Sequence, residues 1–145
     1  MKQITIVFGL LFAISAMGQS KISLKQIEKE NYKEVIGYLT NSTDSIKPDK
    51  YAMYPDGIDG IIEHISKNLK YPWTAYMNGI QGKVLLEFFV GKDGNINTIN
   101  IIQSVDPELD AEAIRVIKKL KKWVSGYKNG EPVMVKYQFP IYFKI

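Results

Sequence analysis

The sequence ends in Val133-Met134-Val135-Lys136-Tyr137-Gln138-Phe139-Pro140-Ile141-Tyr142-Phe143-Lys144-Ile145, and this stretch limits how the rest of the chain can be arranged. Its odd positions are all apolar and its even positions mostly polar, which predicts a strand with one buried and one solvated face. Pro140 cannot donate a hydrogen bond to a neighbouring strand, which favours the edge of a sheet. Because an edge strand keeps unpaired backbone groups, the pattern predicts a site where another chain can bind.

Two more strands and a helix precede this terminal strand. The apolar run 82–90 is joined to the Ile-rich and Thr-rich run 95–103 by a glycine-bearing turn at 91–94, which predicts a β-hairpin. Asp106 as N-cap and Pro107 at the first position then predict the start of a helix. Its expected buried stripe consists of Leu109, Ala113, Val116, Ile117 and Leu120.

The order strand, strand, helix, strand restricts the sheet topology. A right-handed crossover returns the last strand beside the first one, antiparallel to it, in a split β-α-β arrangement. Strand 82–90 is then central, which agrees with its largely apolar residues on both faces. The predicted fold class is therefore α+β, a three-stranded antiparallel sheet with the first strand central, packed by two or three helices.

Helices are also predicted before the hairpin. Ile58, Ile61, Ile62, Ile65 and Leu69 recur at helical spacing, and Tyr71-Pro72 ends this helix. Pro72 can begin a short second helical turn, which Gly79 ends. Four aromatic residues near the helix ends are expected to pack the helices on the sheet rather than to form a binding patch: Trp73, Tyr76, Trp123 and Tyr127.

A series of separated motifs runs through residues 54–145: Tyr71-Pro72-Trp73-Thr74-Ala75, Gly79-Ile80-Gln81-Gly82-Lys83-Val84, Phe88-Phe89-Val90, Asp93-Gly94, Ser104, Leu109-Asp110, Ala113, Trp123, Asn129-Gly130 and Phe139-Pro140-Ile141. Together, and in this order, they resemble the C-terminal domain of TonB, especially its Bacteroidetes-type variants. The resemblance implies a periplasmic module that captures an extended segment of an outer-membrane TonB-dependent transporter by strand addition. It also implies that force comes from a proton-driven inner-membrane complex.

We expect the partner to bind ahead of Pro140, along Val133, Met134, Val135, Lys136, Tyr137, Gln138 and Phe139. Pairing of a second copy through the same edge is an alternative use of this strand. The sequence leaves open which amides face the open edge. Proline at Val135 or Tyr137 is expected to abolish capture if that amide faces outward, and to disrupt the fold if it faces the central strand.

The N-terminal region divides into two expected segments before the TonB-like domain of residues 54–145. Residues 1–18 resemble a secretory signal peptide, because Lys2 precedes an apolar stretch and Ala16-Met17-Gly18 offers small residues for cleavage. The stretch is shorter than the roughly 20 apolar residues of a spanning helix, although retention as a thin anchor stays open. Residues 19–53 are expected to be helical and then linker, with Leu24, Ile27, Val35, Ile36 and Leu39 as an apolar stripe.

Two hypotheses for function differ in whether the chain is anchored in a membrane. An anchored chain would act as an energy transducer, whereas an unanchored one would be a structural or regulatory binding protein of the cell envelope that transmits no force. Cleavage after Gly18 would leave 18 Lys and Arg against 15 Asp and Glu, a net charge of +3 that is too small to indicate nucleic-acid binding.

Other residue patterns argue against an enzyme. The chain has no cysteine, which excludes disulfides, thiolate chemistry and lipoprotein anchoring. The acids Asp106, Glu108, Asp110 and Glu112 fall in the first turns of a helix, where capping explains them. His64 is the only histidine, so we expect a boundary residue rather than a base or metal ligand. No cofactor or metal site is predicted.

Overall fold

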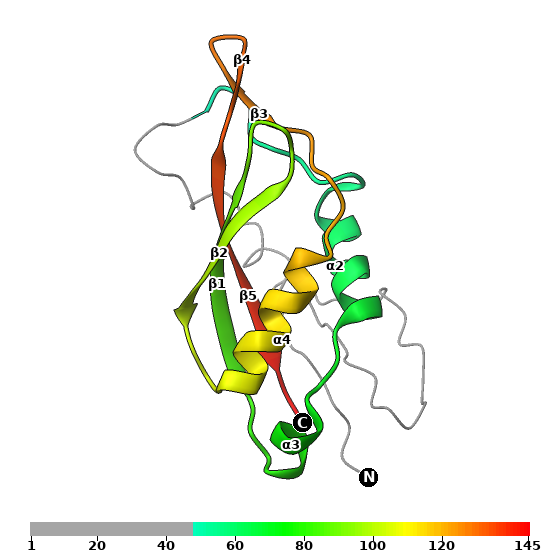
Figure 1. The fold of residues 1–145 in the computed structure, drawn as a ribbon. Coiled ribbons are helices and arrows are strands. Elements are labelled where there is room, and N and C mark those ends of the chain that lie inside the picture. Colours follow the sequence, from blue (N-terminus) through cyan, green and yellow to red (C-terminus); the bar gives the residue numbers. More distant parts are fainter. Residues whose placement is uncertain (1–47) are drawn as a thin grey trace.

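The computed structural model describes residues 48–145, and the signal peptide and N-terminal helix expected within residues 1–47 lie outside the described residues. Helices and strands follow one another in the order α2 (Gly57–Asn68), α3 (Trp73–Met77), β1 (Gly82–Val90), β2 (Ile96–Gln103), α4 (Pro107–Lys118), β3 (Gly126–Lys128), β4 (Glu131–Val133) and β5 (Val135–Phe143). Figure 1 shows the long helices α2 and α4 gathered on one side of the sheet.

The sheet has the predicted topology. Its order is β2-β1-β5, and β1 pairs antiparallel with both neighbours. The pairing of β1 with β5 runs without a register shift from Gly82 opposite Phe143 to Val90 opposite Val135. The α+β fold class and the central position of the first strand are therefore confirmed.

The core lies between the sheet and the two long helices. On β5 the residues at odd positions, from Val135 to Phe143, are buried against this core. Trp123 lies at one end of it, with its ring centroid 5.4 Å from those of Tyr54 and Tyr137 and 5.8 Å from that of Phe88. Apolar burial of this kind is the main stabilising contribution to the fold.

Residues 126–133 form a small β-hairpin that the sequence pattern did not predict. Strands β3 and β4 pair antiparallel, and Asn129 and Gly130 turn the chain between them with positive φ angles of 52° and 77°. The predicted terminal strand is accordingly divided, with Val133 in β4 and the sheet strand beginning at Val135. Strands of three residues are too short to show alternation, although Asn-Gly is a known hairpin signal.

The four aromatic residues expected to pack the helices do so only in part. Trp123 is buried and Tyr76 packs against the core. Trp73, by contrast, is 63% exposed on α3, and Tyr127 is exposed on β3, so the expectation was wrong for these two residues. Both lie on short elements at the ends of the molecule, where too little sheet is present to cover an aromatic ring.

The first described residues are hydrogen-bonded to the C-terminal half of the chain. The amides of Asp49 and Lys50 both donate to the carbonyl of Tyr127, and Met53 exchanges two hydrogen bonds with Val124. The described chain therefore starts beside the β3–β4 hairpin, at the end of the sheet where β5 begins (Figure 1).

Candidate partner-binding edge

The direction of each amide along β5 follows from the position of Pro140. In an antiparallel pair, opposed residues alternate between pairs that exchange hydrogen bonds and pairs that do not. Pro140 lies opposite Leu85 and has no N–H, so this pair exchanges none. Odd-numbered residues of β5 therefore bond to β1, while the amides of Lys136, Gln138 and Tyr142 point away from it. Within residues 48–145 no strand pairs with this outer side of β5.

The seven predicted binding residues thus fall into distinct groups. Val135, Tyr137 and Phe139 direct their amides to β1 and their side chains into the core. Lys136 and Gln138 direct their backbone groups to the open edge. Val133 pairs with Gly126 in the small hairpin, and Met134 is an exposed link between the two strands.

The other outer strand, β2, is less suited to receive an extended segment. Its pairing with β1 is shifted between Leu85 and Leu86 and again between Phe88 and Phe89. Thr98 lies at the second irregularity with a positive φ of 43°, which bends the edge locally. Irregular edges of this kind oppose further strand addition, whereas β5 offers a straight one.

Charged side chains flank the open edge on the face of the sheet turned away from the helices. The Lys136 ammonium lies 3.7 Å from the carboxylate of Glu87 on the central strand. A lysine beside the edge can also approach an acidic side chain of an incoming strand, but as a charge near the rim it contributes little affinity. The backbone groups of β5 are therefore the main candidate for contact with an incoming strand.

The acidic side chains at the start of α4 cap the helix and bind neighbouring groups of the same chain. The Asp106 carboxylate caps the helix by accepting from the Glu108 amide at 2.9 Å. Asp110 accepts from the Ser104 hydroxyl and from the Val105 amide, and Glu112 forms a bidentate pair with Arg115. In the described part of the chain, no three acidic or histidine side chains are grouped to hold a metal ion.

His64 is half-buried on α2, as expected of a boundary residue. Its Nε2 is 3.2 Å from the Val116 carbonyl oxygen. Burial lowers the pKa of His64; the Val116 hydrogen bond opposes this change, and the charges of Lys119 and Lys121 add to it. This histidine joins two helices and lies away from the β5 edge.

A pH dependence of stability follows from this histidine. Because its folded-state pKa is below the unfolded value, the unfolded chain takes up a proton first as pH falls through about 6.5. We expect the free energy of unfolding to decrease between about pH 7.5 and about pH 5.5, and to decrease less in His64→Gln. Urea denaturation at several pH values measures both slopes, and equal slopes would contradict the assignment.

The fold and its straight open edge define a small α+β module suited to strand addition. The family model for the Gram-negative bacterial TonB protein C-terminal domain matches residues 67–145, more than half of the chain. The chain therefore belongs to the TonB C-terminal domain family.

Among the solved structures similar to this chain, one TonB C-terminal domain shares its fold. The solution structure of the Helicobacter pylori TonB C-terminal domain is 21% identical with a TM-score of 0.53, covering 77% of this chain and 92% of that one. The solution structure of the Pseudomonas aeruginosa TonB C-terminal domain is 29% identical with a TM-score of 0.42, covering 52% of this chain and 76% of that one. Comparison with curated protein sequences gave no significant match.

Proposed function

We propose that this protein captures an extended segment of an outer-membrane TonB-dependent transporter by strand addition to β5, and so supports energy-coupled transport across the outer membrane. The observation that carries the proposal is the straight outer edge of β5, with the amides of Lys136, Gln138 and Tyr142 directed away from β1. Membership of the TonB C-terminal domain family supports the choice of partner.

The geometry specifies how such a segment would be bound. Its backbone would exchange hydrogen bonds with Lys136 and Gln138, and further along the strand it could only donate to the carbonyl of Pro140. Its side chains directly opposite these residues would project on the same side of the sheet as Lys136 and Gln138, the side turned away from the helices. Because Val135 and Tyr137 are fixed in the core, the edge is held in its extended form before the partner arrives, which lowers the entropic cost of binding.

Gln138→Pro tests this proposal. Proline at position 138 removes an outward-facing donor while the bonds from β5 to β1 stay intact, so the domain is expected to fold and to bind a transporter-derived extended peptide about tenfold more weakly. Fluorescence anisotropy with a labelled peptide measures the affinity. Gln138→Ala, which keeps the amide, is the matched control and is expected to bind nearly as well as wild type.

Two outcomes would contradict strand addition at this edge. The first is equal affinity of Gln138→Pro and Gln138→Ala. The second is a larger loss from Lys136→Ala than from Gln138→Pro, because removal of a charge near the rim is expected to cost at most about 1 kcal/mol. Either result would place recognition in side chains or on another surface.

The location that fits this function is the periplasm, reached through the signal peptide expected at residues 1–18. No helix within residues 48–145 is long and apolar enough to cross a bilayer. Mass spectrometry of protein from cell fractions tests the location and the anchor together. A chain beginning at Gln19 in the periplasmic fraction would favour the unanchored envelope protein, whereas an intact chain in the inner-membrane fraction would favour the energy transducer.

A further inference from the structure

Four exposed lysines follow one another at the end of α4 and just after it. Beside them, Val124 exchanges two hydrogen bonds with Met53, and the two side chains are 52% and 54% exposed. Residues opposed in an antiparallel bridge project on the same side, so these two apolar side chains lie next to each other. We call this region the basic surface and define it by its residues: Lys118, Lys119, Lys121, Lys122, Met53 and Val124.

Hydrogen bonds fix the backbone that carries the basic surface. The Lys121 amide donates to the Tyr54 hydroxyl at 3.3 Å, and the Trp123 amide donates to the Gly94 carbonyl at 2.8 Å. The Trp123 side chain is buried in the core, whereas the residues on either side of it are exposed. The lysines and the apolar pair are therefore held on a preformed segment.

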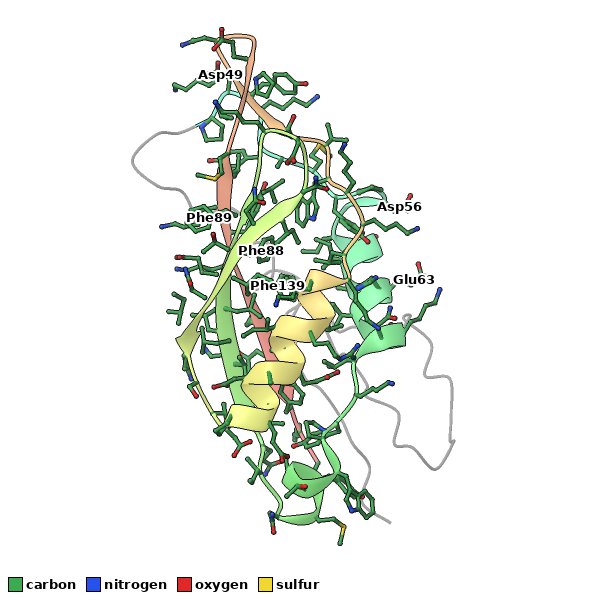
Figure 2. All side chains as sticks on the ribbon, viewed as in Figure 1. Asp49, Asp56, Glu63, Phe88, Phe89 and Phe139 are labelled. Carbon is green, nitrogen blue, oxygen red and sulfur yellow. The ribbon has the colours of Figure 1, made fainter. Side chains whose placement is uncertain are left out.

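No lysine of the basic surface forms an ion pair within residues 48–145. Two acidic side chains lie close enough to feel these lysines, but both have other partners. Glu63 projects from α2 (Figure 2) and is paired with Lys67. Asp93 accepts hydrogen bonds from the amide and the side chain of Asn95.

The end of the helix explains only part of this charge. Cations in the last turn of a helix interact favourably with its dipole, which accounts for Lys118 and Lys119. This effect falls off within one turn, so Lys121 and Lys122, which follow the helix, gain little from it. Four like charges within residues 118–122 repel one another, and a negatively charged partner would relieve this repulsion.

We propose that the basic surface binds the headgroups of an anionic phospholipid bilayer. Lysine side chains are flexible and adapt to fluid headgroups without a matching groove, and each contributes roughly fivefold in affinity near such a surface. The exposed pair Met53 and Val124 can enter the layer beneath the headgroups, which a soluble acidic partner does not offer. This contact leaves strand addition possible, because Lys136 and Gln138 project on the side of the sheet turned away from the helices.

A fluorescent label beside the lysines tests the proposal in the full chain, which has no natural cysteine. A local label is needed because the apolar residues 4–17 can bind vesicles on their own. Val124→Cys carries an environment-sensitive nitrobenzoxadiazole group, and the vesicles contain equal parts of phosphatidylcholine and phosphatidylglycerol. We expect blue-shifted and roughly twofold brighter emission with these vesicles, and no change with phosphatidylcholine alone. The label in Ile102→Cys, 50% exposed on β2, is the matched control and is expected to stay unchanged.

Paired substitutions test the role of charge. Lys121→Gln with Lys122→Gln removes two charges from the basic surface. Lys70→Gln with Lys144→Gln removes two exposed charges near α3, at the other end of the sheet (Figure 1). Titration of the Val124→Cys label with vesicles is expected to show binding weakened about twentyfold by the first pair and less than about twofold by the second.

Three outcomes would contradict the proposal: no response of the Val124→Cys label to anionic vesicles, equal responses from the Val124→Cys and Ile102→Cys labels, or equal losses from the two pairs of substitutions. Binding of soluble polyglutamate without a response to vesicles would show that the basic surface fits an acidic protein instead. Met53→Cys, labelled in the same way, is expected to repeat the Val124→Cys result. Unchanged thermal unfolding of the labelled proteins verifies that the fold is intact.

Discussion

Gly94→Ala is expected to destabilise the domain by about 3 kcal/mol or more and to lower its melting temperature by more than about 10 °C. Gly94 has a φ of 82°, and a Cβ atom there would lie 2.0 Å from the carbonyl oxygen of Trp123. The same glycine accepts a hydrogen bond from the Trp123 amide at 2.8 Å. An added methyl group must therefore separate the β1–β2 turn from the loop after α4.

Gly130→Ala is the matched control for this substitution. Gly130 also has a positive φ, 77°, but a Cβ there would meet no atom within 4 Å. Alanine at this position is disfavoured only by its backbone, because a residue with a Cβ atom rarely adopts a positive φ, and this costs about 1 kcal/mol. Thermal unfolding followed by circular dichroism compares the two variants, and equal losses would show that contact between Gly94 and Trp123 is unimportant.

Tyr137→Pro is expected to unfold most of the protein, with a loss of about 4 kcal/mol or more. Proline removes the bond that the Tyr137 amide donates to β1, in the middle of the sheet. It also deletes a buried ring stacked on Trp123 at 5.4 Å, together with a hydroxyl that donates to the Ala52 carbonyl at 2.5 Å. The sequence left the direction of the Tyr137 amide open, and the register between β1 and β5 directs it toward β1.

Gln138→Pro is the neighbouring control, because the same substitution one residue later falls on an outward-facing amide. It is expected to retain a cooperative unfolding transition. Urea denaturation followed by tryptophan fluorescence measures both variants. If Gln138→Pro unfolds as readily as Tyr137→Pro, or if both remain stable, the alternation inferred from Pro140 is wrong.

The sheet could be predicted from sequence because its strands are long and its turns carry clear signals. Nine apolar-rich residues in β1 and the alternation in β5 specify which strand is central and which lies at the edge. The Asp106 cap and Pro107 likewise mark the start of α4. Strands β3 and β4 were missed because three residues show no period, and their Asn-Gly turn was the available signal.

The sequence predicted the strand that forms the candidate site, but not which of its backbone groups face the open edge. Sequence alternation separates core side chains from outward ones, yet it cannot say which backbone groups are already paired until the register is known. Pro140 could have supplied this information, since a proline in an edge strand is tolerated where its nitrogen faces the open side. The pairing of Glu87 with Lys136 depends on the diagonal register between β1 and β5 and has no local signal.

Residue-resolved hydrogen exchange, with and without a transporter-derived extended peptide, tests strand addition most directly. Bound peptide is expected to slow exchange at the outward amides of Lys136, Gln138 and Tyr142. The alternating amides of Val135, Tyr137 and Phe139 are already bonded to β1 and should change little. Slowed exchange at the basic residues 118–122, at the end of α4 and just after it, with Lys136 and Gln138 unchanged, would contradict the proposed function.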